Sequence, residues 1–278
     1  MTEQPIYPCF WFDNQAKEAA TFYCSLFDGA KITAENPMVV IWELYGKKMM
    51  HLNGGPVFSI TPAISMFVTC ETESEIETLC EKLSREGAAI MPLGSYPWCE
   101  KYAWVKDQFG LTWQLMLGKI PPHGEKIHPV FLFSANQYGK ARAALDHYAA
   151  IFPNSTLHEQ QLYVAGEVQP EGNLKFAHFN LNGAFFAAMD GPGEFAFNEG
   201  FSLVVSCDTQ EEIDHYWDAL TEGGAESQCG WLKDKFGVSW QIVPTVLEQL
   251  MGDPEKSGRV TQAFMKMKKM DIATLLNA

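Results

Sequence analysis

Apolar and polar residues recur in the same order twice along this chain, which predicts two copies of one structural unit. Residues 105–116 read VKDQFGLTWQLM and residues 232–243 read LKDKFGVSWQIV. Each copy is typical of a strand, a turn closed by glycine, and a second strand. Side chains alternate along that second strand, so we expect Trp113 on one face and Gln114 on the other. Gln241 repeats this arrangement, which predicts an amide at the same place in both halves.

Other segments repeat as well. FYCSLF at 22–27 corresponds to HYAAIF at 147–152, and the apolar residues around both keep helical spacing. Residues 65–83 correspond to 202–220, again with the apolar positions in the same phase. The first copy differs mainly by extra residues at 89–101. The core-facing residues are therefore duplicated together with the sequence.

The order of elements predicts the fold class α+β, with tandem βαβββ units. In the first copy we expect strands at 7–12, 30–36, 39–44, 47–52, 63–70, 88–93 and 102–106, a strand around Trp113, and helices at 16–27 and 74–85. In the second we expect strands at 130–133 and 201–207, further strands before Ala188 and after the last helix, and helices at 138–152 and 211–222.

Three parts follow along the chain. A first module spans 1–119 and a second spans 127–245, joined by a short stiff linker at 119–126 that contains Pro121 and Pro122. A tail at 246–278 has no counterpart in the first module. We expect in it a helix at 246–251, a second helix opened by Asp253 and Pro254, and a last turn after Asp271.

Charge and composition exclude several classes of function. The chain has 278 residues and a net charge of -14, which argues against nucleic acid or an anionic membrane as partner. No apolar run is long enough to span a bilayer, and the first residues lack the features of a signal peptide. We expect a cytoplasmic protein. Its seven cysteines include no CxxC pair, which favours reduced, buried thiols over disulfides or a metal cluster.

The repeated pattern resembles a known family. The order of strands and helices, the NGG at 53–55, the entries to the second helices after Cys70 and Cys207, and DKFGVSWQ at 234–241 are similar to the PhnB-like branch of the vicinal oxygen chelate (glyoxalase and bleomycin resistance) superfamily. That branch is also labelled 3-demethylubiquinone-9 3-methyltransferase-like. The resemblance covers nearly the whole chain. It implies that pairs of βαβββ units curl into two cups, each a curved mixed sheet around a ligand or metal site.

Superfamily enzymes hold a divalent metal in such cups. Carried onto this sequence, the eighth-strand ligand is matched by Gln114 and Gln241, the fifth-strand histidine by Ser65 and Ser202, and the first-strand ligand falls near Pro8 and Pro129. His51 matches the fourth strand in the first module, where the second has Ala188. Amides and hydroxyls are poor ligands for Zn, Ni or Fe. We therefore predict that these residues bind no metal and that the protein has no cofactor. The alternative is that one cup holds a divalent metal.

The methyltransferase label has its own requirement. A common S-adenosylmethionine site needs a glycine-rich loop between a strand and a helix of a parallel α/β fold. Gly54 and Gly55 instead lie between strands, and Gly223 and Gly224 end a helix. We expect no methyltransferase activity.

The candidate residues each allow a second interpretation. The candidate ligand contacts are Trp11, Glu43, His51, Ser65, Trp98, Gln114, Ser202 and Gln241. Glu43, His51 and His178 are also candidate acids or bases, since an ionisable group on a strand can face a cup. The alternative is structural for all of them, because buried amides and histidines are normally satisfied within the protein and aromatic residues pack in cores.

Three functions fit these observations. The first is a metal-independent protein that binds a small, partly aromatic or apolar molecule. The second is a metal-dependent lyase, isomerase or dioxygenase with its site in the first module, which carries Glu43, His51 and the longer Trp98 loop. In the third, the second module only supports the first. We expect the two modules to pack on each other within one chain, and a homodimer stays open.

Overall fold

The computed structural model describes residues 5–121 and 124–278, so residues 1–4 and Pro122 of the predicted linker lie outside the described residues. The first repeat contains β1 (Ile6–Phe12), α1 (Ala16–Leu26), β2 (Lys31–Glu35), β3 (Val39–Leu44), β4 (Lys47–Asn53), β5 (Ile64–Cys70), α2 (Glu73–Ser84), β6 (Ala88–Tyr96), β7 (Cys99–Lys106) and β8 (Thr112–Leu117).

The second repeat has the same order, with one added 3₁₀ turn. It contains β9 (Ile127–Phe133), η1 (Ala135–Gln137), α3 (Ala141–Ile151), β10 (Thr156–Leu162), β11 (Leu174–Leu181), β12 (Ala184–Asp190), β13 (Phe201–Cys207), α4 (Gln210–Thr221), β14 (Ala225–Glu226), β15 (Trp231–Lys233) and β16 (Ser239–Pro244). The tail follows with α5 (Val246–Gly252), α6 (Ser257–Phe264) and α7 (Ile272–Leu276).

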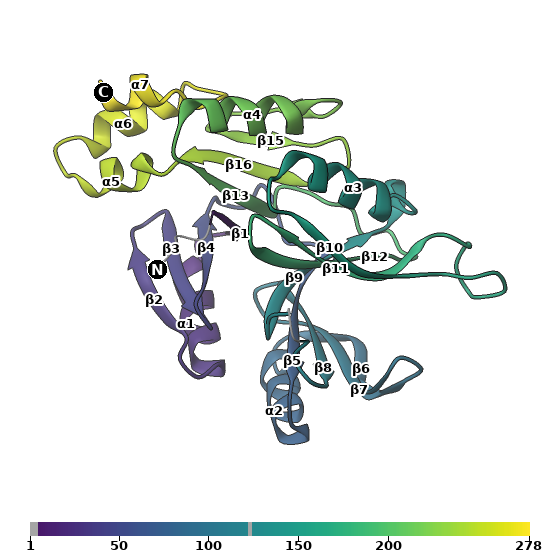
Figure 1. Ribbon diagram of the computed structural model, residues 1–278. Coiled ribbons are helices and arrows are strands. Elements are labelled where there is room, and N and C mark those ends of the chain that lie inside the picture. Colours follow the sequence, from purple (N-terminus) through teal and green to yellow (C-terminus); the bar gives the residue numbers. More distant parts are fainter. Residues whose placement is uncertain (1–4, 122–123) are drawn as a thin grey trace.

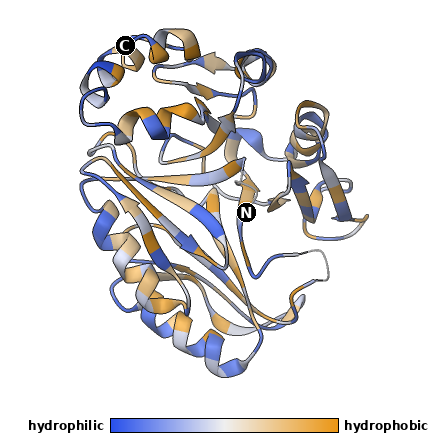
Figure 2. Ribbon diagram, turned by 60° about the vertical axis from the view of Figure 1, so that its left-hand side comes forward, coloured by the Kyte–Doolittle hydropathy of each residue, from blue (hydrophilic) through white to orange (hydrophobic). Residues whose placement is uncertain are grey.

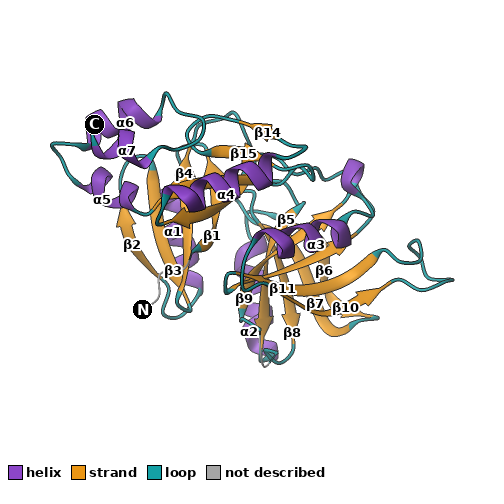
Figure 3. Cartoon of the chain, turned by 45° about the horizontal axis from the view of Figure 1, so that its top comes forward, coloured by secondary structure: helices purple, strands orange, loops and turns teal. Residues whose placement is uncertain are grey.

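The strands form two eight-stranded mixed sheets, which confirms the predicted α+β fold class. Sheet A has the order β14-β15-β16-β13-β1-β4-β3-β2, and sheet B has the order β10-β11-β12-β9-β5-β8-β7-β6. Each sheet therefore takes one βαβββ unit from each repeat. The two units of a sheet join through antiparallel pairs, β1 with β13 and β5 with β9. Both sheets curve, with helices packed against one face (Figures 1 and 3).

The main hydrophobic core lies on the helix side of both sheets. Alternation along each strand sends one set of apolar residues to this core and the other set to the opposite face, and Figure 2 shows the resulting bands of hydrophobic and hydrophilic residues. Trp113 and Trp240 are fully buried in the core, as the sequence predicts. We call the opposite face of each sheet its cup face.

A duplicated buried carboxylate ties each repeat together. Asp107 accepts hydrogen bonds from Tyr23 Oη on α1 and Trp113 Nε1 on β8, both at 2.8 Å. Its second oxygen accepts from the backbone N–H groups of Phe109 and Leu111. Asp234 makes the matching set with Tyr148, Trp240, Phe236 and Val238. The turns close at Gly110 and Gly237 with φ of +89° and +86°, which confirms the positive φ expected there.

Two helix starts differ from the sequence-based prediction. The helix expected from residue 138 begins at Ala141, after the 3₁₀ turn Ala135–Gln137. In the tail, α6 begins at Ser257 and not at Pro254, because Asp253 accepts from the N–H of Glu255 in a turn of its own. Asp271 does cap α7, by accepting from the N–H of Thr274. No helix among the described residues is long and apolar enough to cross a membrane.

Candidate functional site

One row of side chains runs across four neighbouring strands on the cup face of sheet B. His128 on β9 is paired with Phe67 on β5, Phe67 with Gln114 on β8, and Gln114 with Trp104 on β7. Paired residues share a face, so these four side chains lie side by side. Around them pack further apolar and aromatic residues, which are Met91, Tyr96, Cys99, Tyr102, Met116, Val130, Phe176, Ala187 and Met189.

Gln114 is held in one orientation at the centre of this row. Its Nε2 donates to Ser65 Oγ at 2.7 Å, and its Oε1 accepts from Tyr102 Oη at 2.8 Å. All three residues are buried, and burial raises the pKa of the Tyr102 phenol, which keeps it a donor. The structure thus brings the predicted pair Gln114 and Ser65 together. The sequence-based analysis missed Tyr102.

Polar groups at both ends of the row are buried. Trp104 Nε1 has no hydrogen-bond partner within the described residues. The buried His128 ring has the backbone of Glu125 as its hydrogen-bond partner, which acts against the effect of burial on its pKa. Burial, and next the neighbouring His178, lower the pKa of His128 to about 3, so its imidazole is neutral. Its ring stacks on Phe67 with centroids 5.2 Å apart. Buried polar groups are normally paired, so Trp104 Nε1 is an exception among the polar atoms of this face.

Sheet A repeats the row with different chemistry. Tyr7, Val204, Gln241 and Trp231 stand in the places of His128, Phe67, Gln114 and Trp104. Gln241 Nε2 donates to Ser202 Oγ at 2.9 Å, so the second predicted pair also forms. Burial raises the pKa of the adjacent Cys9 thiol to about 12, which keeps it protonated.

His51 does not face a cup, contrary to its proposed role as ligand contact, acid or metal ligand. It is fully buried on the helix side of β4, where one ring nitrogen accepts from Trp42 Nε1 at 2.8 Å and the other lies 3.1 Å from the Ala16 carbonyl. Burial lowers its pKa to about 3. His51 is a satisfied core residue because the alternation on β4 sends odd-numbered side chains toward the helices.

The other candidates fall on both sheets. Glu43 lies in sheet A and pairs with Lys31 at 3.5 Å. His178 lies on the cup face of sheet B between Phe176 and Phe185. Trp98 is 58% exposed and stacks on Tyr96 beyond the rim of the same sheet. The first-module features that we expected to share one cup are therefore divided between two sheets.

Aromatic residues also close one end of each cup face. In sheet A, Trp11 donates from Nε1 to the Gly55 carbonyl at 2.7 Å and packs against Phe58 and Trp231. Gly54 is required here, since an added Cβ would lie 2.1 Å from the Trp11 ring. In sheet B, Phe195 packs against Trp104 in the same manner. Trp11 is thus a wall residue that a ligand in sheet A would meet.

The residues at the superfamily's metal positions do not fit a transition metal. The cup faces offer an amide, a hydroxyl and apolar side chains at these places, where Zn, Ni or Fe would need imidazole, carboxylate or thiolate. Over residues 5–121 and 124–278, no group of three or more His, Cys, Asp or Glu side chains is arranged to hold a metal ion. The two buried imidazoles, His51 and His128, belong to no such group.

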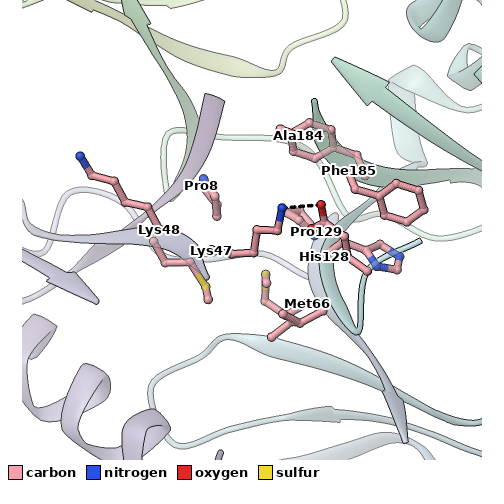
Figure 4. A pocket seen from close by; sticks show the side chains of 12 residues that line it. Pro8, Lys47, Lys48, Met66, His128, Pro129, Ala184 and Phe185 are labelled. Atoms are coloured by element: carbon pink, nitrogen blue, oxygen red, sulfur yellow. Dashed lines mark ion pairs between the residues drawn. The ribbon is translucent and has the colours of Figure 1, made fainter. Parts of the chain in front are cut away.

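A small, partly open space lies between the two sheets, next to His128. It measures about 20 Å³ and is lined by residues that include Pro8, Lys47, Met66 and His128, which gives room for one water molecule. Figure 4 shows Lys47 turned toward Glu125, with which it forms an ion pair at 2.6 Å, and Lys48 turned the other way. This space is too small for an organic ligand.

Sequence signals for the missed residues did exist. Trp104 and Trp231 occupy the same position before each repeated turn. Alternation along their strands turns both side chains toward the cup faces. His128 stands one residue before Pro129, the position taken for the first-strand ligand, and a one-residue difference on a strand moves a side chain to the other face. Tyr102 has only Cys229 as counterpart, so the repeat itself does not mark it.

The tandem βαβββ units and their two matched cup faces define a protein of the vicinal oxygen chelate, glyoxalase-like superfamily. The family model described as 3-demethylubiquinone-9 3-methyltransferase matches residues 4–116 and 125–243, and the chain belongs to this family.

Three solved structures are similar to this chain in sequence or in fold. A Bacillus cereus PhnB protein, described as a 3-demethylubiquinone-9 3-methyltransferase, is 39% identical over 41% of this chain and 100% of its own, with a TM-score of 0.39. A Staphylococcus aureus protein is 33% identical over 43% of this chain and 100% of its own, with a TM-score of 0.20. Glyoxalase I from Zea mays is 11% identical over 89% of this chain and 95% of its own, with a TM-score of 0.57, and supports the fold alone. No curated protein matches the chain.

Proposed function

We propose that this protein binds a small, partly aromatic or apolar molecule on the cup face of sheet B, without a tightly held transition metal. The observation that carries the proposal is the buried Trp104 Nε1, which has no hydrogen-bond partner within the described residues, on a face that is lined mainly by apolar and aromatic side chains. A pocket that is mostly apolar with a few placed polar groups is the usual design of a small-molecule site.

Each residue of the row has a defined part in this proposal. Phe67 and the neighbouring aromatic rings would contact the flat faces of the ligand and exclude water. Trp104 Nε1 can only donate, so it would recognise an acceptor such as a carbonyl oxygen. Neutral His128 can donate or accept. Gln114, fixed by Ser65 and Tyr102, would keep the centre of the site rigid, which lowers the entropic cost of binding.

The proposal excludes methyl transfer and a tight metal site. Both sheets are mixed, and parallel pairs such as β1 with β4 and β5 with β8 alternate with antiparallel ones, unlike the parallel sheet of common S-adenosylmethionine enzymes. Calorimetry that detects saturable S-adenosylmethionine binding would contradict the first exclusion. A stoichiometric metal in protein purified without a nickel column would contradict the second and favour a metal-dependent lyase, isomerase or dioxygenase.

We also propose that the protein works in the cytoplasm. All seven of its cysteines are free, as is usual in a reducing compartment. Cell fractionation with antibody detection tests this location.

Saturation-transfer NMR with a panel of neutral, planar aromatic fragments tests the binding site. We expect fragments that bind the wild-type protein to bind Gln114→Leu roughly fivefold more weakly, because the amide that holds Ser65 and Tyr102 in place is lost and the centre of the site becomes less rigid. Gln241→Leu is the matched control, because it removes the equivalent amide from sheet A. Equal binding to both variants, each checked for an unchanged melting temperature, would overturn the proposal.

A further inference from the structure

We infer that two loops of the chain position each other, so that a polar side chain of each loop holds the aromatic residue at the end of the opposite sheet. The loops are 54–63, between β4 and β5, and 191–200, between β12 and β13. Each one connects the two sheets, because β4 and β13 belong to sheet A while β5 and β12 belong to sheet B. Their role rests on the proposed function only where ligand binding is measured.

The two loops are repeats of one another. Both have ten residues, GGPVFSITPA and GPGEFAFNEG, and their alignment places Phe58 opposite Phe195 and Thr61 opposite Asn198. Neither loop contains a helix or a strand, so no regular backbone pairing fixes its shape. The shape of each loop therefore depends on the individual contacts that it makes.

Each loop carries an aromatic residue to the end of one cup face. Phe58 packs edge-on against Trp11 in sheet A, with ring centroids 5.1 Å apart. Phe195 packs edge-on against Trp104 in sheet B, with ring centroids 6.0 Å apart. Edge-to-face contact favours particular relative orientations of two rings. The position of each phenylalanine thus sets the shape of the cup beside it.

The hydrogen bonds between the two loops are reciprocal. Thr61 Oγ1 donates to the carbonyl of Ala196 at 2.9 Å, and Asn198 Nδ2 donates to the carbonyl of Ser59 at 3.0 Å. Each acceptor directly follows the phenylalanine of its own loop. The loops also touch at Gly200, where an added Cβ would lie 2.4 Å from the Ser59 oxygen. Each loop is therefore fixed next to its aromatic residue by a side chain of the other loop.

Loss of one of these bonds should act mainly on the opposite sheet. Without the Thr61 hydroxyl, the backbone that follows Phe195 loses a partner, and the ring can shift within sheet B. Ser134 Oγ still donates to the Phe195 carbonyl at 2.6 Å, so this loop keeps a second attachment. Loss of the Asn198 amide instead frees the backbone that follows Phe58, at the end of sheet A. Thr61 and Asn198 are positioning residues, each for the aromatic wall of the other loop.

The indole N–H signals of the ¹⁵N-labelled full chain test this crossed effect. Trp11 and Trp104 report the two ends, since the signal of each indole depends on where the adjacent phenylalanine ring lies, and each signal is assigned by its loss on substitution with Phe. We expect Thr61→Val to shift the Trp104 signal more than the Trp11 signal, and Asn198→Asp to do the reverse. Asn198→Asp keeps the oxygen that accepts from the N–H of Gly200 at 2.8 Å and removes the donor.

Binding of acetophenone, a neutral aromatic ketone, measures the consequence for sheet B. Thr61→Val should weaken binding about threefold, as is usual for a residue that acts on a site through others. Thr61→Ser keeps the hydroxyl and should bind like the wild-type protein. The matched control is Thr21→Val, which removes a hydroxyl that donates to the Lys17 carbonyl at 2.8 Å on α1. It should change neither indole signal and leave acetophenone binding as it is.

Two results would overturn the inference. One is a Trp104 signal that Thr61→Val leaves unchanged. The other is a shift by Thr61→Val that is larger at Trp11 than at Trp104, because each loop would then position only its own aromatic residue. Acetophenone that fails to bind the wild-type protein counts against the proposed function instead, and the indole signals still decide the role of the loops without any ligand.

Discussion

At the scale of single residues, buried polar groups differ in how completely the fold supplies their hydrogen-bond partners. Asp107 and Asp234 each accept four hydrogen bonds from their own repeat, so they are fully satisfied. Trp104 Nε1 has no such partner within the described residues, and His128 has only the backbone of Glu125. The contrast assigns the aspartates to the stability of the fold.

Asp107→Asn should lower the free energy of unfolding by about 2–3 kcal/mol, because the new amide N–H₂ would face the donors of Tyr23 and Trp113 and leave buried donors unpaired. Urea denaturation of the variant measures the loss. Asp28→Asn, on an exposed carboxylate, is the control and should stay within about 0.5 kcal/mol of the wild-type protein. A loss for Asp107→Asn no larger than that of the control would show that the network contributes little.

His128 should make stability depend on pH. Its pKa falls from 6.5 in the unfolded chain to about 3 in the folded protein because of burial. Its stabilising contribution is therefore complete above pH 6.5 and is lost as pH falls toward 3, by about 1.4 kcal/mol per pH unit. His128→Phe removes this dependence, so the difference in unfolding free energy between variant and wild type should grow in favour of the variant from pH 7 to pH 5.

The test compares the unfolding free energy of His128→Phe with that of the wild-type protein, because Asp107 changes the stability of both proteins with pH in the opposite direction. Burial raises the pKa of Asp107 from 3.8 to about 6, so its contribution is present below pH 3.8 and lost as pH rises to 6. Both proteins share this effect. An unfolding free-energy difference that does not vary between pH 7 and pH 5 would contradict a neutral, buried His128.

Residues that the repeat marks as equivalent do lie at equivalent places. Gln114 bonds to Ser65 and Gln241 bonds to Ser202, on the cup faces of the two sheets. His51 was proposed as a site residue because it matches the fourth-strand position of the superfamily, and its side chain points toward α1. The face of one strand residue depends on pairing and register, which composition does not specify.

At the scale of elements, helices and strands follow local sequence signals closely. Thr209 caps α4 by accepting from the N–H of Glu212, whose carboxylate accepts in turn from the N–H of Thr209. The helices α3 and α6 begin later than predicted because turns at Ala135–Gln137 and around Asp253 satisfy the backbone groups before them. Helix starts that depend on such turns are the least visible in a sequence.

Thr209→Ala should destabilise the protein by about 1 kcal/mol through loss of this capping box. Thermal unfolding followed by circular dichroism measures the effect. Thr209→Ser keeps the hydroxyl and should retain most of the stability, while equal destabilisation by both substitutions would point to the lost methyl group rather than to the cap.

At the scale of the whole molecule, the sequence repeats and the sheets do not coincide. The repeats match the family at 4–116 and 125–243, yet each sheet combines a unit from both. The repeat alone predicted four βαβββ units but could not show which units share a sheet, since strands β1 and β5 can pair with any equivalent edge. Because β3 joins sheet A while β6 and β7 join sheet B, Glu43 and Trp98 lie on different sheets.

Residues 1–119 expressed alone should form a dimer. Without the second repeat, β1 and β5 lose their partners β13 and β9 and present open edges, which a second copy can fill with its own β5 and β1. Light scattering after gel filtration distinguishes this outcome from a folded monomer, which would show that the edges are tolerated and that the sheets need no second repeat.

The most direct test of the central claim is native mass spectrometry of untagged protein taken directly from cells, read for bound metal and for a retained organic molecule. The account predicts no stoichiometric metal, and a retained small molecule in the wild-type protein and in Gln241→Leu that is absent from Gln114→Leu. One divalent metal per chain, or a retained molecule unaffected by Gln114→Leu, would contradict binding on the cup face of sheet B.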